Sequence, residues 1–337
     1  MIATTKPKVL VARAVFPEVL ARLDEHFEVS ANQDDRVLDS AALSQRLAGK
    51  AGAFITASER IDAALLDAHP QLRAVCNMAV GYNNIDLPAC TARGVLVTNT
   101  PDVLTETTAD FGFALMMAAS RRIAESEHYL RGGRWTKWSY DLFAGAEVHG
   151  TTLGVLGMGR IGQAIARRGF LGFGMPVLYH NRSRLPEATE AALGARWVGK
   201  DELLERSDHL VIVVPYSPES HHLIGAAELQ RMKPTATLTN IARGGVVDDA
   251  ALALALRERW IAAAGLDVFE GEPALNPALL EVPNVVLTPH IASASIATRR
   301  AMAELAARNL IAALGCGPEA GRPPTPLNPQ LLDRPPA

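Results

Sequence analysis

Residues 153–162 read Leu-Gly-Val-Leu-Gly-Met-Gly-Arg-Ile-Gly, a short apolar run that ends in a glycine-rich turn. Gly157, Gly159 and Gly162 have the G-x-G-x-x-G spacing, and helical periodicity follows them. In such a motif the first glycine permits a tight turn, the second lets the backbone approach a pyrophosphate, and the third lets the helix pack on the strand. The helix N-terminus adds unpaired N–H groups for the phosphates. An incidental glycine turn is the alternative, but the flanking strand and helix favour dinucleotide binding.

The next apolar run ends in a second informative stretch, which reads Tyr-His-Asn-Arg-Ser-Arg over residues 179–184. An acidic residue at this strand end accepts a hydrogen bond from the ribose 2′-hydroxyl of NAD. Here Asn181 takes that place, and Arg182 and Arg184 follow it. A carboxylate would repel a 2′-phosphate, whereas guanidinium groups bind phosphate through forked hydrogen bonds. We therefore expect NADPH to be preferred and NADH to be the weaker cofactor; ordinary solvated arginines are the alternative.

Around these stretches, short β-branched or apolar runs alternate with helical patterns in two series, which predicts parallel α/β sheets. The expected strands are residues 9–11, 27–29, 53–56, 74–76 and 95–98 in the first series, and 153–156, 177–179, 210–214, 237–241, 262–266 and 285–287 in the second. A long helix is expected from near Thr107, capped by Thr107 and Asp110, to just before Gly132. Residues 135–150 have no clean period and predict a surface excursion. A last helix is expected over residues 296–314, followed by an extended tail.

Polar residues follow three of the expected strands in the second series. Arg243 lies in residues 240–248, Glu272 in residues 264–273, and His290 in residues 287–293. The carboxyl ends of strands in an open α/β sheet form the ligand crevice. Taken singly, each residue fits a structural turn or a solvated loop, and Arg243 could pair with Asp248. Their joint occurrence at three strand ends favours acid–base chemistry on an anionic substrate.

With these segments, the chain resembles the D-2-hydroxyacid dehydrogenase family over nearly its whole length, and most of all the bacterial glyoxylate/hydroxypyruvate reductases that also reduce 2-ketogluconate. The three segments match the family's signatures, and residues 80–86, Val-Gly-Tyr-Asn-Asn-Ile-Asp, match its substrate loop. The resemblance implies a Rossmann cofactor domain, residues 104–290, inserted in a flavodoxin-like substrate domain, residues 1–103 and 291–337. It also implies a homodimer, with the long helix packed against its mate and Trp138 either reaching the partner's site or anchoring locally.

The resemblance assigns site residues as well. It implies that Arg243, Glu272 and His290 are catalytic, with Glu272 rather than Glu270 as the partner of His290. It implies that the backbone N–H groups of Val80 and Gly81, with Arg243 and His290, hold the substrate. The residues implied to bind the cofactor are Gly157, Gly159, Arg160, Ile161, Asn181, Arg182, Ser183, Arg184, Pro215, Ser217, Ile241, Asp267 at the nicotinamide, and Thr107.

The chemistry of a 2-keto acid agrees with these roles. Arg243 can grip the carboxylate and the adjacent carbonyl with its donor fork and polarise the carbonyl. Hydride transfer leaves an alkoxide that needs a proton, and histidine is the natural donor near neutral pH. A carboxylate beside His290 would favour the imidazolium and fix the ring. In the oxidative direction, neutral His290 takes the proton back.

Length and composition limit the number of domains and the kinds of partner that the protein can have. The chain has 337 residues, which suggests about two domains at roughly 150 residues each. With 33 basic and 36 acidic residues it carries no basic excess for nucleic acid. The three scattered cysteines argue for a reducing compartment, and neither a secretory signal nor an apolar run of membrane length is present, so we expect a cytoplasmic protein without membrane partners.

Two alternatives and one further motif remain. A D-lactate or phosphoglycerate dehydrogenase-like enzyme is possible, as is a non-catalytic, nucleotide-sensing protein like the corepressors of the same fold. His221 and His222 suggest a metal pair, but adjacent residues in a strand or helix diverge and no third ligand is evident. We therefore expect no metal.

Overall fold

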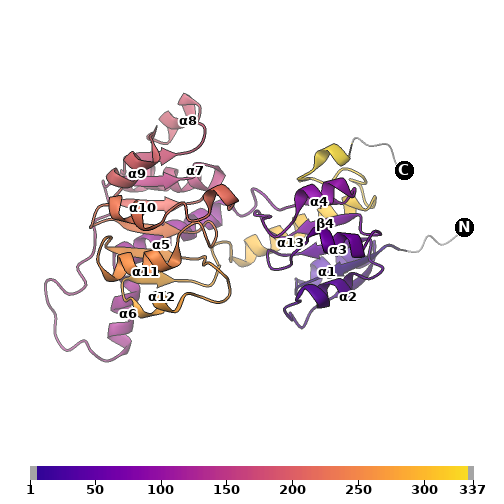
Figure 1. Ribbon diagram of the computed structural model, residues 1–337, viewed down its shortest axis with the longest axis horizontal. Coiled ribbons are helices and arrows are strands. Elements are labelled where there is room, and N and C mark those ends of the chain that lie inside the picture. Colours follow the sequence, from indigo (N-terminus) through magenta and orange to yellow (C-terminus); the bar gives the residue numbers. More distant parts are fainter. Residues whose placement is uncertain (1–5, 333–337) are drawn as a thin grey trace, which may run out of the picture. The chain divides into compact units, whose positions relative to one another are not determined.

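The computed structural model describes residues 6–332 and divides the chain into two compact units (Figure 1). Unit 1 combines both ends of the chain, residues up to Leu104 and from Ser295, and unit 2 comprises Thr105–Ala294. The chain thus passes into unit 2 one residue later than expected from the sequence and leaves it four residues later. Each unit is built around its own parallel sheet.

Unit 1 is a doubly wound domain with a five-stranded parallel sheet in the order β2-β1-β3-β4-β5. This is the flavodoxin-like order. Its strands are β1 (Lys8–Val11), β2 (Glu28–Ala31), β3 (Gly52–Ile55), β4 (Ala74–Asn77) and β5 (Leu96–Thr98). Its helices are α1 (Pro17–Asp24), α2 (Ser40–Leu47), α3 (Ala63–Ala68), α4 (Leu87–Ala92), α13 (Ile296–Ala313) and the short η3 (Pro329–Leu331).

The central strands β3 and β4 of the unit 1 sheet are fully buried, whereas the edge strand β2 is only partly buried and contains Glu28 and Ser30. Leu10 joins the core on one face, while its neighbours Val9 and Val11 join the core on the other. The second face is covered by α13, which packs so closely on β3 that a Cβ at Gly52 would lie 2.8 Å from Leu310 Cδ1. The described part of the tail after α13 is tied to the sheet, since the Asn328 side chain accepts from the N–H of Val97 at the edge strand β5.

Unit 2 holds a seven-stranded parallel sheet in the order β12-β11-β10-β9-β6-β7-β8. From β6 the sheet continues to β7 and β8 on one side and to β9, β10 and β11 on the other, which is the Rossmann order, and β12 is added at the edge. The strand order reverses between β6 and β9. Its strands are β6 (Leu153–Leu156), β7 (Val177–His180), β8 (Ala195–Trp197), β9 (His209–Ile212), β10 (Thr237–Asn240), β11 (Ala263–Leu266) and β12 (Val285–Leu287). Its helical segments are α5 (Thr105–Ser120), α6 (Ile123–Arg131), α7 (Arg160–Arg167), the π-helical η1 (Arg168–Gly172), α8 (Glu187–Ala192), α9 (Lys200–Arg206), the 3₁₀ turn η2 (Pro218–Ser220), α10 (Ala226–Arg231), α11 (Asp249–Arg257) and α12 (Pro277–Glu281).

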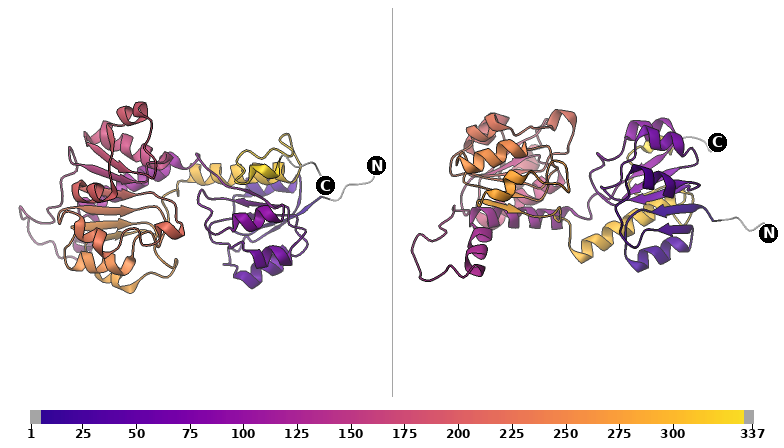
Figure 2. Two further views of the ribbon diagram at one scale, coloured as in Figure 1. Left: turned by 45° about the horizontal axis from the view of Figure 1, so that its top comes forward. Right: turned by 60° about the horizontal axis from the view of Figure 1, so that its bottom comes forward.

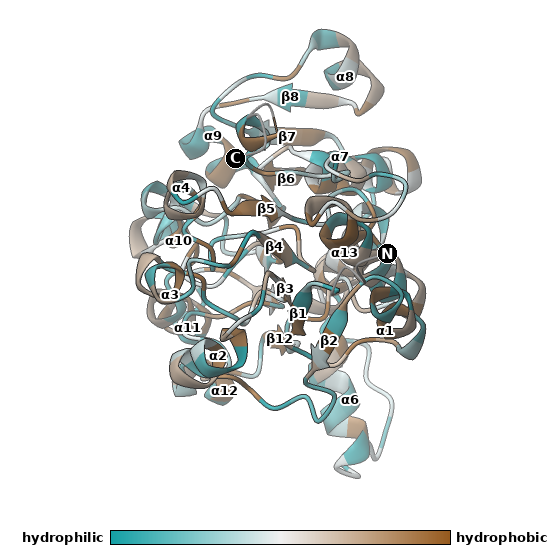
Figure 3. Cartoon of the chain, turned by 90° about the vertical axis from the view of Figure 1, so that its right-hand side faces the viewer, coloured by the Kyte–Doolittle hydropathy of each residue, from teal (hydrophilic) through white to brown (hydrophobic). Residues whose placement is uncertain are grey.

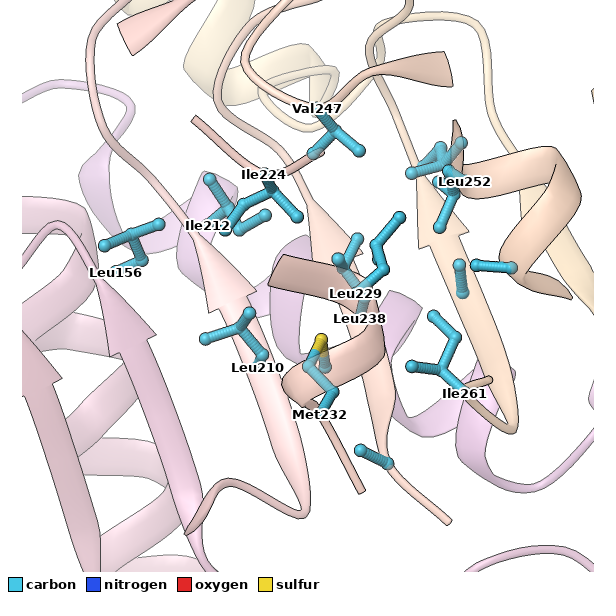
Figure 4. Packing of buried hydrophobic residues seen from close by; sticks show 14 of the residues in the cluster. Leu156, Leu210, Ile212, Ile224, Leu229, Met232, Leu238, Val247, Leu252 and Ile261 are labelled. Atoms are coloured by element: carbon cyan, nitrogen blue, oxygen red, sulfur yellow. The ribbon is translucent and has the colours of Figure 1, made fainter. Parts of the chain in front are cut away.

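The core of unit 2 lies on both faces of its sheet. On one face, strand side chains such as Leu210 and Leu238 meet Leu229 of α10 and Leu252 of α11 (Figure 4). On the other face, α5 crosses the sheet closely enough that a Cβ at Gly265 would lie 2.7 Å from the Leu115 side chain. The polar ends of the strands, not these packed faces, are therefore left to form a site.

The sequence misses β8 and places the long helix wrongly. Strand β8 is short, at the sheet edge, and contains Arg196 and the exposed Trp197, so it has no apolar run (Figure 3). Helix α5 begins at Thr105, so Thr107 lies within it and does not cap it. It ends at Ser120 because the returning chain closes on it: the N–H of Ala146 donates to the Ser120 carbonyl at 2.8 Å. The hydrophobic pattern of the helix itself cannot reveal this contact with a residue far along the chain.

The segment from α6 to residue 150 projects from the body of unit 2 (Figure 2). We call α6 and residues 132–147 the arm. It exposes Ile123, Leu130, Trp135, Trp138 and Tyr140. Its two halves pack on each other, with the rings of Tyr129 and Phe143 at a centroid distance of 5.2 Å. Residues 135–150 contain no helix, which confirms the expected surface excursion, and α6 lies within the range expected to be helical. Among residues 6–332, no helix has the length and apolar composition needed to cross a membrane.

Candidate active site

The glycine-rich turn lies at the point where the strand order of unit 2 reverses, between β6 and β9. Gly157 has φ +103°, and a Cβ there would lie 2.8 Å from the backbone of Val213, so only glycine fits. A Cβ at Gly162 would lie 2.2 Å from the Gly157 carbonyl oxygen, which shows how closely α7 packs on the turn. At Gly159 a Cβ would meet no atom within 4 Å. The three glycines thus have the geometry expected for a pyrophosphate cradle, with open space in front of the second.

Asn181 is tied to that turn. Its Oδ1 accepts from the N–H of Met158 at 2.7 Å, and its own carbonyl accepts from Trp197 Nε1 at 3.1 Å. An aspartate could accept the same bond from Met158, so the turn does not require an amide. What the amide changes is charge, because it brings no negative group to the ribose position.

The arginines beside Asn181 differ in their surroundings. Arg184 forms a forked ion pair with Glu190 of α8, with Nη2 at 2.6 Å from Oε2. Glu190 is buried and also accepts from Tyr179 Oη at 2.6 Å, and together the two donors lower the pKa of Glu190 to about 2. Arg182 is exposed. The loop is therefore fixed by Arg184 and Glu190, and only part of the Arg184 guanidinium remains for a phosphate.

The other predicted cofactor residues lie on five segments of unit 2. Arg160 and Ile161 begin α7, and Ser183 lies between the two arginines. Pro215 and Ser217 lie in the loop after β9, where the N–H of Ser217 donates to Ser220 Oγ at 2.7 Å. Thr107 is on α5, and Ile241 is buried against the same helix near Gly112. Their contacts with a cofactor remain predictions.

Arg243 is held at the end of β10 by a close crossing of two loops. A Cβ at Gly244 would lie 1.7 Å from the Phe269 carbonyl oxygen, so only glycine lets the loop after β10 pass the loop after β11. Arg243 Nη1 donates to the Ala242 carbonyl at 2.7 Å. Burial lowers the pKa of Arg243, and the negative charge of Glu272 acts against that shift. Arginine keeps its charge even so.

Glu272 and His290, which the sequence predicts to act as an acid–base pair, lie in hydrogen-bond contact. Glu272 Oε2 accepts from His290 Nδ1 at 2.8 Å, and Glu272 Oε1 accepts from the N–H of Phe269 at 2.8 Å. Burial acts to raise the pKa of Glu272, but the hydrogen bond and charge of His290 outweigh it and leave that pKa below its ordinary value. Glu270 contacts His222 instead, with Oε2 at 3.0 Å from Nε2. The structure therefore brings Glu272, not Glu270, to His290.

Asp267 holds the turn that carries His290. It is fully buried, and its Oδ1 accepts from the Thr288 hydroxyl at 2.7 Å and the N–H of Ile291 at 2.8 Å, while Oδ2 accepts from the N–H of Ala292 at 2.8 Å. His290 itself has φ +54°, which is uncommon for a non-glycine residue. The three hydrogen bonds thus fix the turn. A contact of Asp267 with the nicotinamide remains a prediction.

Val80 and Gly81 belong to unit 1, where hydrogen bonds to the carbonyls of their loop hold it in place. The carbonyls of Ala79 and Val80 accept from Thr100 N and Asn99 Nδ2, both at 2.9 Å. In a trans peptide the N–H points opposite to the carbonyl. The N–H groups of Val80 and Gly81 therefore both point away from these donors, an arrangement suited to a carboxylate.

Sequence reasoning missed the residues that position the site. Tyr179 and Glu190 fix the arginine loop, and Asn99 fixes the loop of unit 1. Nothing in the sequence of α8 marked Glu190 as the partner of Arg184, because the folded loop is what brings the two side chains together. The sequence argument against a histidine pair does not apply here, because His221 and His222 lie outside the strands and helices. Their rings stack at 3.9 Å, and Glu270 lies beside them as a third group that the sequence did not reveal.

Comparisons with known proteins agree with this geometry. Residues 113–292 match the family described as D-isomer specific 2-hydroxyacid dehydrogenase, NAD binding domain. The chain is 50% identical over 311 residues to a glyoxylate reductase of Thermococcus onnurineus, covering 91% of this chain and 92% of that one. A glyoxylate reductase of Pyrococcus furiosus is 47% identical over the same length, covering 91% and 92%.

A solved structure extends the likeness to three dimensions. The NADPH-dependent glyoxylate/hydroxypyruvate reductase of Sinorhizobium meliloti, in complex with NADP and malonate, superimposes with a TM-score of 0.84 at 37% identity, covering 99% of this chain and all of that one. Because the likeness covers 99% of this chain, it extends over both units. The chain belongs to the D-isomer specific 2-hydroxyacid dehydrogenase family and is an NAD(P)-dependent 2-hydroxyacid dehydrogenase.

Proposed function

We propose that the enzyme reduces small 2-keto acids to D-2-hydroxy acids with NADPH, with glyoxylate and hydroxypyruvate as the first substrates and 2-ketogluconate as a further candidate. The observation that carries the proposal is the 2.8 Å hydrogen bond between Glu272 and His290. Glu272 lies on the loop after β11, which crosses the Arg243 loop, and His290 lies on the loop after β12. The names of the relatives, glyoxylate reductase and glyoxylate/hydroxypyruvate reductase, support this substrate class.

Arg243 binds and polarises the substrate in this scheme. Its guanidinium is planar and presents forked donors that match a carboxylate and the adjacent carbonyl oxygen. Partial burial removes competing water, so its charge acts more strongly on the negative charge that develops on the carbonyl oxygen. The paired N–H groups of Val80 and Gly81 are a second donor set of the kind that holds a carboxylate.

His290 supplies the proton. A carboxylate only accepts hydrogen bonds, so His290 Nδ1 carries the hydrogen that faces Glu272. The other ring nitrogen, Nε2, is then the one that donates to the substrate alkoxide. Glu272 stabilises the charged ring before the transfer and keeps its orientation afterwards. When bound, the nicotinamide supplies the hydride for the carbonyl carbon.

NADPH preference follows from the ribose-facing loop. Asn181 brings no negative charge. Arg182 follows it directly and is exposed, so it is the side chain that we expect to donate hydrogen bonds to a 2′-phosphate. Arg184 contributes with the part of its guanidinium that Glu190 does not occupy. A bound NADP in the Sinorhizobium meliloti neighbour supports this choice.

The enzyme works as a homodimer in the cytoplasm. Helix α6 spans nine residues with none buried, and an isolated helix of that length is unstable in water. A second copy packed on the arm would cover Ile123, Leu130 and the exposed tryptophans. Cys76, Cys90 and Cys316 are free thiols, as a reducing compartment predicts.

A panel of 2-keto acids, assayed with NADPH and NADH, tests the proposal. It includes glyoxylate, hydroxypyruvate, 2-ketogluconate, pyruvate and phosphohydroxypyruvate. We expect the highest kcat/KM with glyoxylate or hydroxypyruvate and NADPH. A preference for pyruvate or phosphohydroxypyruvate would favour a lactate or phosphoglycerate dehydrogenase-like enzyme, and nucleotide binding without any turnover would favour a sensing protein.

A further inference from the structure

Three side chains of unit 2 outside the catalytic pair form a cluster of metal-binding type: His221, His222 and Glu270, called here the His-His-Glu cluster. Each offers one nitrogen or oxygen atom, and these atoms all lie within 4.8 Å of one another. His222 Nε2 is 3.0 Å from Glu270 Oε2, and the two imidazole rings stack at 3.9 Å with an interplanar angle of 23°.

The backbone explains why two adjacent histidines point the same way. Neighbouring side chains diverge in a regular strand or helix, but His222 has φ +49°. Its N–H donates to the Gly245 carbonyl at 2.7 Å, which fixes this conformation against the loop after β10. The positive φ value takes His222 out of regular structure, and the two rings come to lie one on the other.

Glu270 arrives from a different loop and is fixed independently. Its N–H donates to Asp249 Oδ2 at 3.0 Å, so the start of α11 holds the backbone from which its side chain extends. His222 Nδ1 also lies 3.9 Å from Asp248 Oδ2. In metal sites, a carboxylate near the second ring nitrogen commonly orients the imidazole, so Asp248 is suited to that role.

We propose that the His-His-Glu cluster binds one divalent transition-metal cation of the Zn²⁺, Co²⁺ and Ni²⁺ class. Two imidazole nitrogens and one carboxylate oxygen are a donor set for these ions, whereas Mg²⁺ and Ca²⁺ prefer oxygen alone. Zinc–nitrogen bonds of about 2.0 Å separate tetrahedral ligand atoms by roughly 3.3 Å, so small side-chain rotations close the present spacing. His222 and Glu270 are 37% and 44% exposed, which leaves room for water as the remaining ligand.

The bound cation would join two loops next to the active site. His221 Nδ1 lies 3.3 Å from Tyr216 Oη, in the loop that contains Pro215 and Ser217. Glu270 precedes Glu272 by two residues. The cation would therefore cross-link the loop after β9 to the loop after β11, and metal binding should raise Tm. The inference uses no step of the proposed reaction and stands without it.

Calorimetric titration tests this site with untagged, EDTA-treated protein and Zn²⁺. We expect one equivalent per chain, and visible absorption of the Co²⁺-loaded protein should show nitrogen ligation. His222→Gln and Glu270→Gln should each weaken Zn²⁺ binding at least about tenfold. His128→Gln, which changes an exposed histidine of α6 outside the cluster, is the matched control and should bind as the wild type does.

The proposal is overturned if no saturable equivalent binds, or if both cluster variants bind Zn²⁺ as tightly as the His128→Gln control. A Co²⁺ spectrum like that of the hexaaquo ion would also overturn it. Because the cluster side chains are exposed, both variants should keep the metal-free Tm of the wild type. A metal-induced rise in Tm that persists in both variants would place the cation elsewhere and contradict the assignment.

Discussion

Glu272 connects the backbone of its own loop to the ring of His290, with one carboxylate oxygen for each. One oxygen fixes the side chain to the backbone of Phe269, and the other aligns the imidazole that we propose as the proton donor. Glu270, which is only two residues away, points to a different histidine and cannot replace it.

Glu272→Gln tests this role of Glu272 by removing its single negative charge. The amide keeps the size of the side chain but loses the negative charge that faces His290 Nδ1. We expect kcat for reduction to fall by about 10²-fold or more, in the range of lost general acid catalysis. Steady-state kinetics measure this effect, and Glu270→Gln is the control. A kcat in Glu272→Gln equal to that of the wild type would count against the assignment.

Asn181→Asp tests cofactor choice with a nearly isosteric change. Aspartate can still accept from the N–H of Met158 but places a charge where a 2′-phosphate would lie. We expect the ratio of kcat/KM for NADPH to that for NADH to fall at least about tenfold, since one charge-assisted contact contributes roughly 1.5–3 kcal/mol. Arg182→Ala should lower the same ratio through NADPH alone. Equal losses with both cofactors would show that the loop does not recognise the phosphate.

At the scale of elements, the loop between β7 and α8 depends on the buried Glu190. Its pKa of about 2 lies below that of an unfolded glutamate, so its ionised form stabilises the folded state. That stability is fully present above the unfolded pKa of about 4.3 and is lost as pH falls towards the folded value. The loop that carries Arg182 should therefore loosen in acid.

Glu190→Gln should lower Tm at neutral pH by roughly a few degrees, and the difference from wild type should shrink as pH falls below about 4. It should also raise KM for NADPH, because the loop that carries Arg182 loosens when Glu190 no longer holds it. Thermal unfolding at several pH values checks the first effect. Glu187→Gln, at an exposed position of the same helix, is the matched control. A Tm difference that is independent of pH would contradict the ionic account.

The strands and helices also show which parts of the fold can be predicted from the sequence. Strands β6 and β12 are predicted to the residue, because each is a short run of apolar residues; β6 is buried throughout, and β12 is partly buried at the sheet edge. Strand β8 has no such run, and α5 ends at Ser120, where Ala146 returns to it. Likewise Arg243, Glu272 and His290 follow predictable strands, whereas Glu190, Asn99 and the His-His-Glu cluster depend on contacts that only the fold creates.

At the scale of the whole molecule, the arm is the feature that a monomer leaves unexplained. Leu130 on α6 is 58% exposed in the single chain. We expect sedimentation equilibrium to give about twice the chain mass of 36.0 kDa. Leu130→Glu should shift the protein to the monomer, whereas Leu254→Glu, at an exposed position on α11, should not. A monomeric wild type would rule out the dimer.

The most direct test of the central claim is the rate of glyoxylate reduction by the wild type and by Arg243→Ala, measured together with the dissociation constant for NADPH. The account predicts turnover in the wild type and a loss of about 10³-fold or more in kcat/KM in the variant, because the polarising charge is gone. It predicts an unchanged dissociation constant, since Arg243 binds substrate and not cofactor. Near-wild-type turnover in Arg243→Ala, or a parallel loss of NADPH binding, would contradict it.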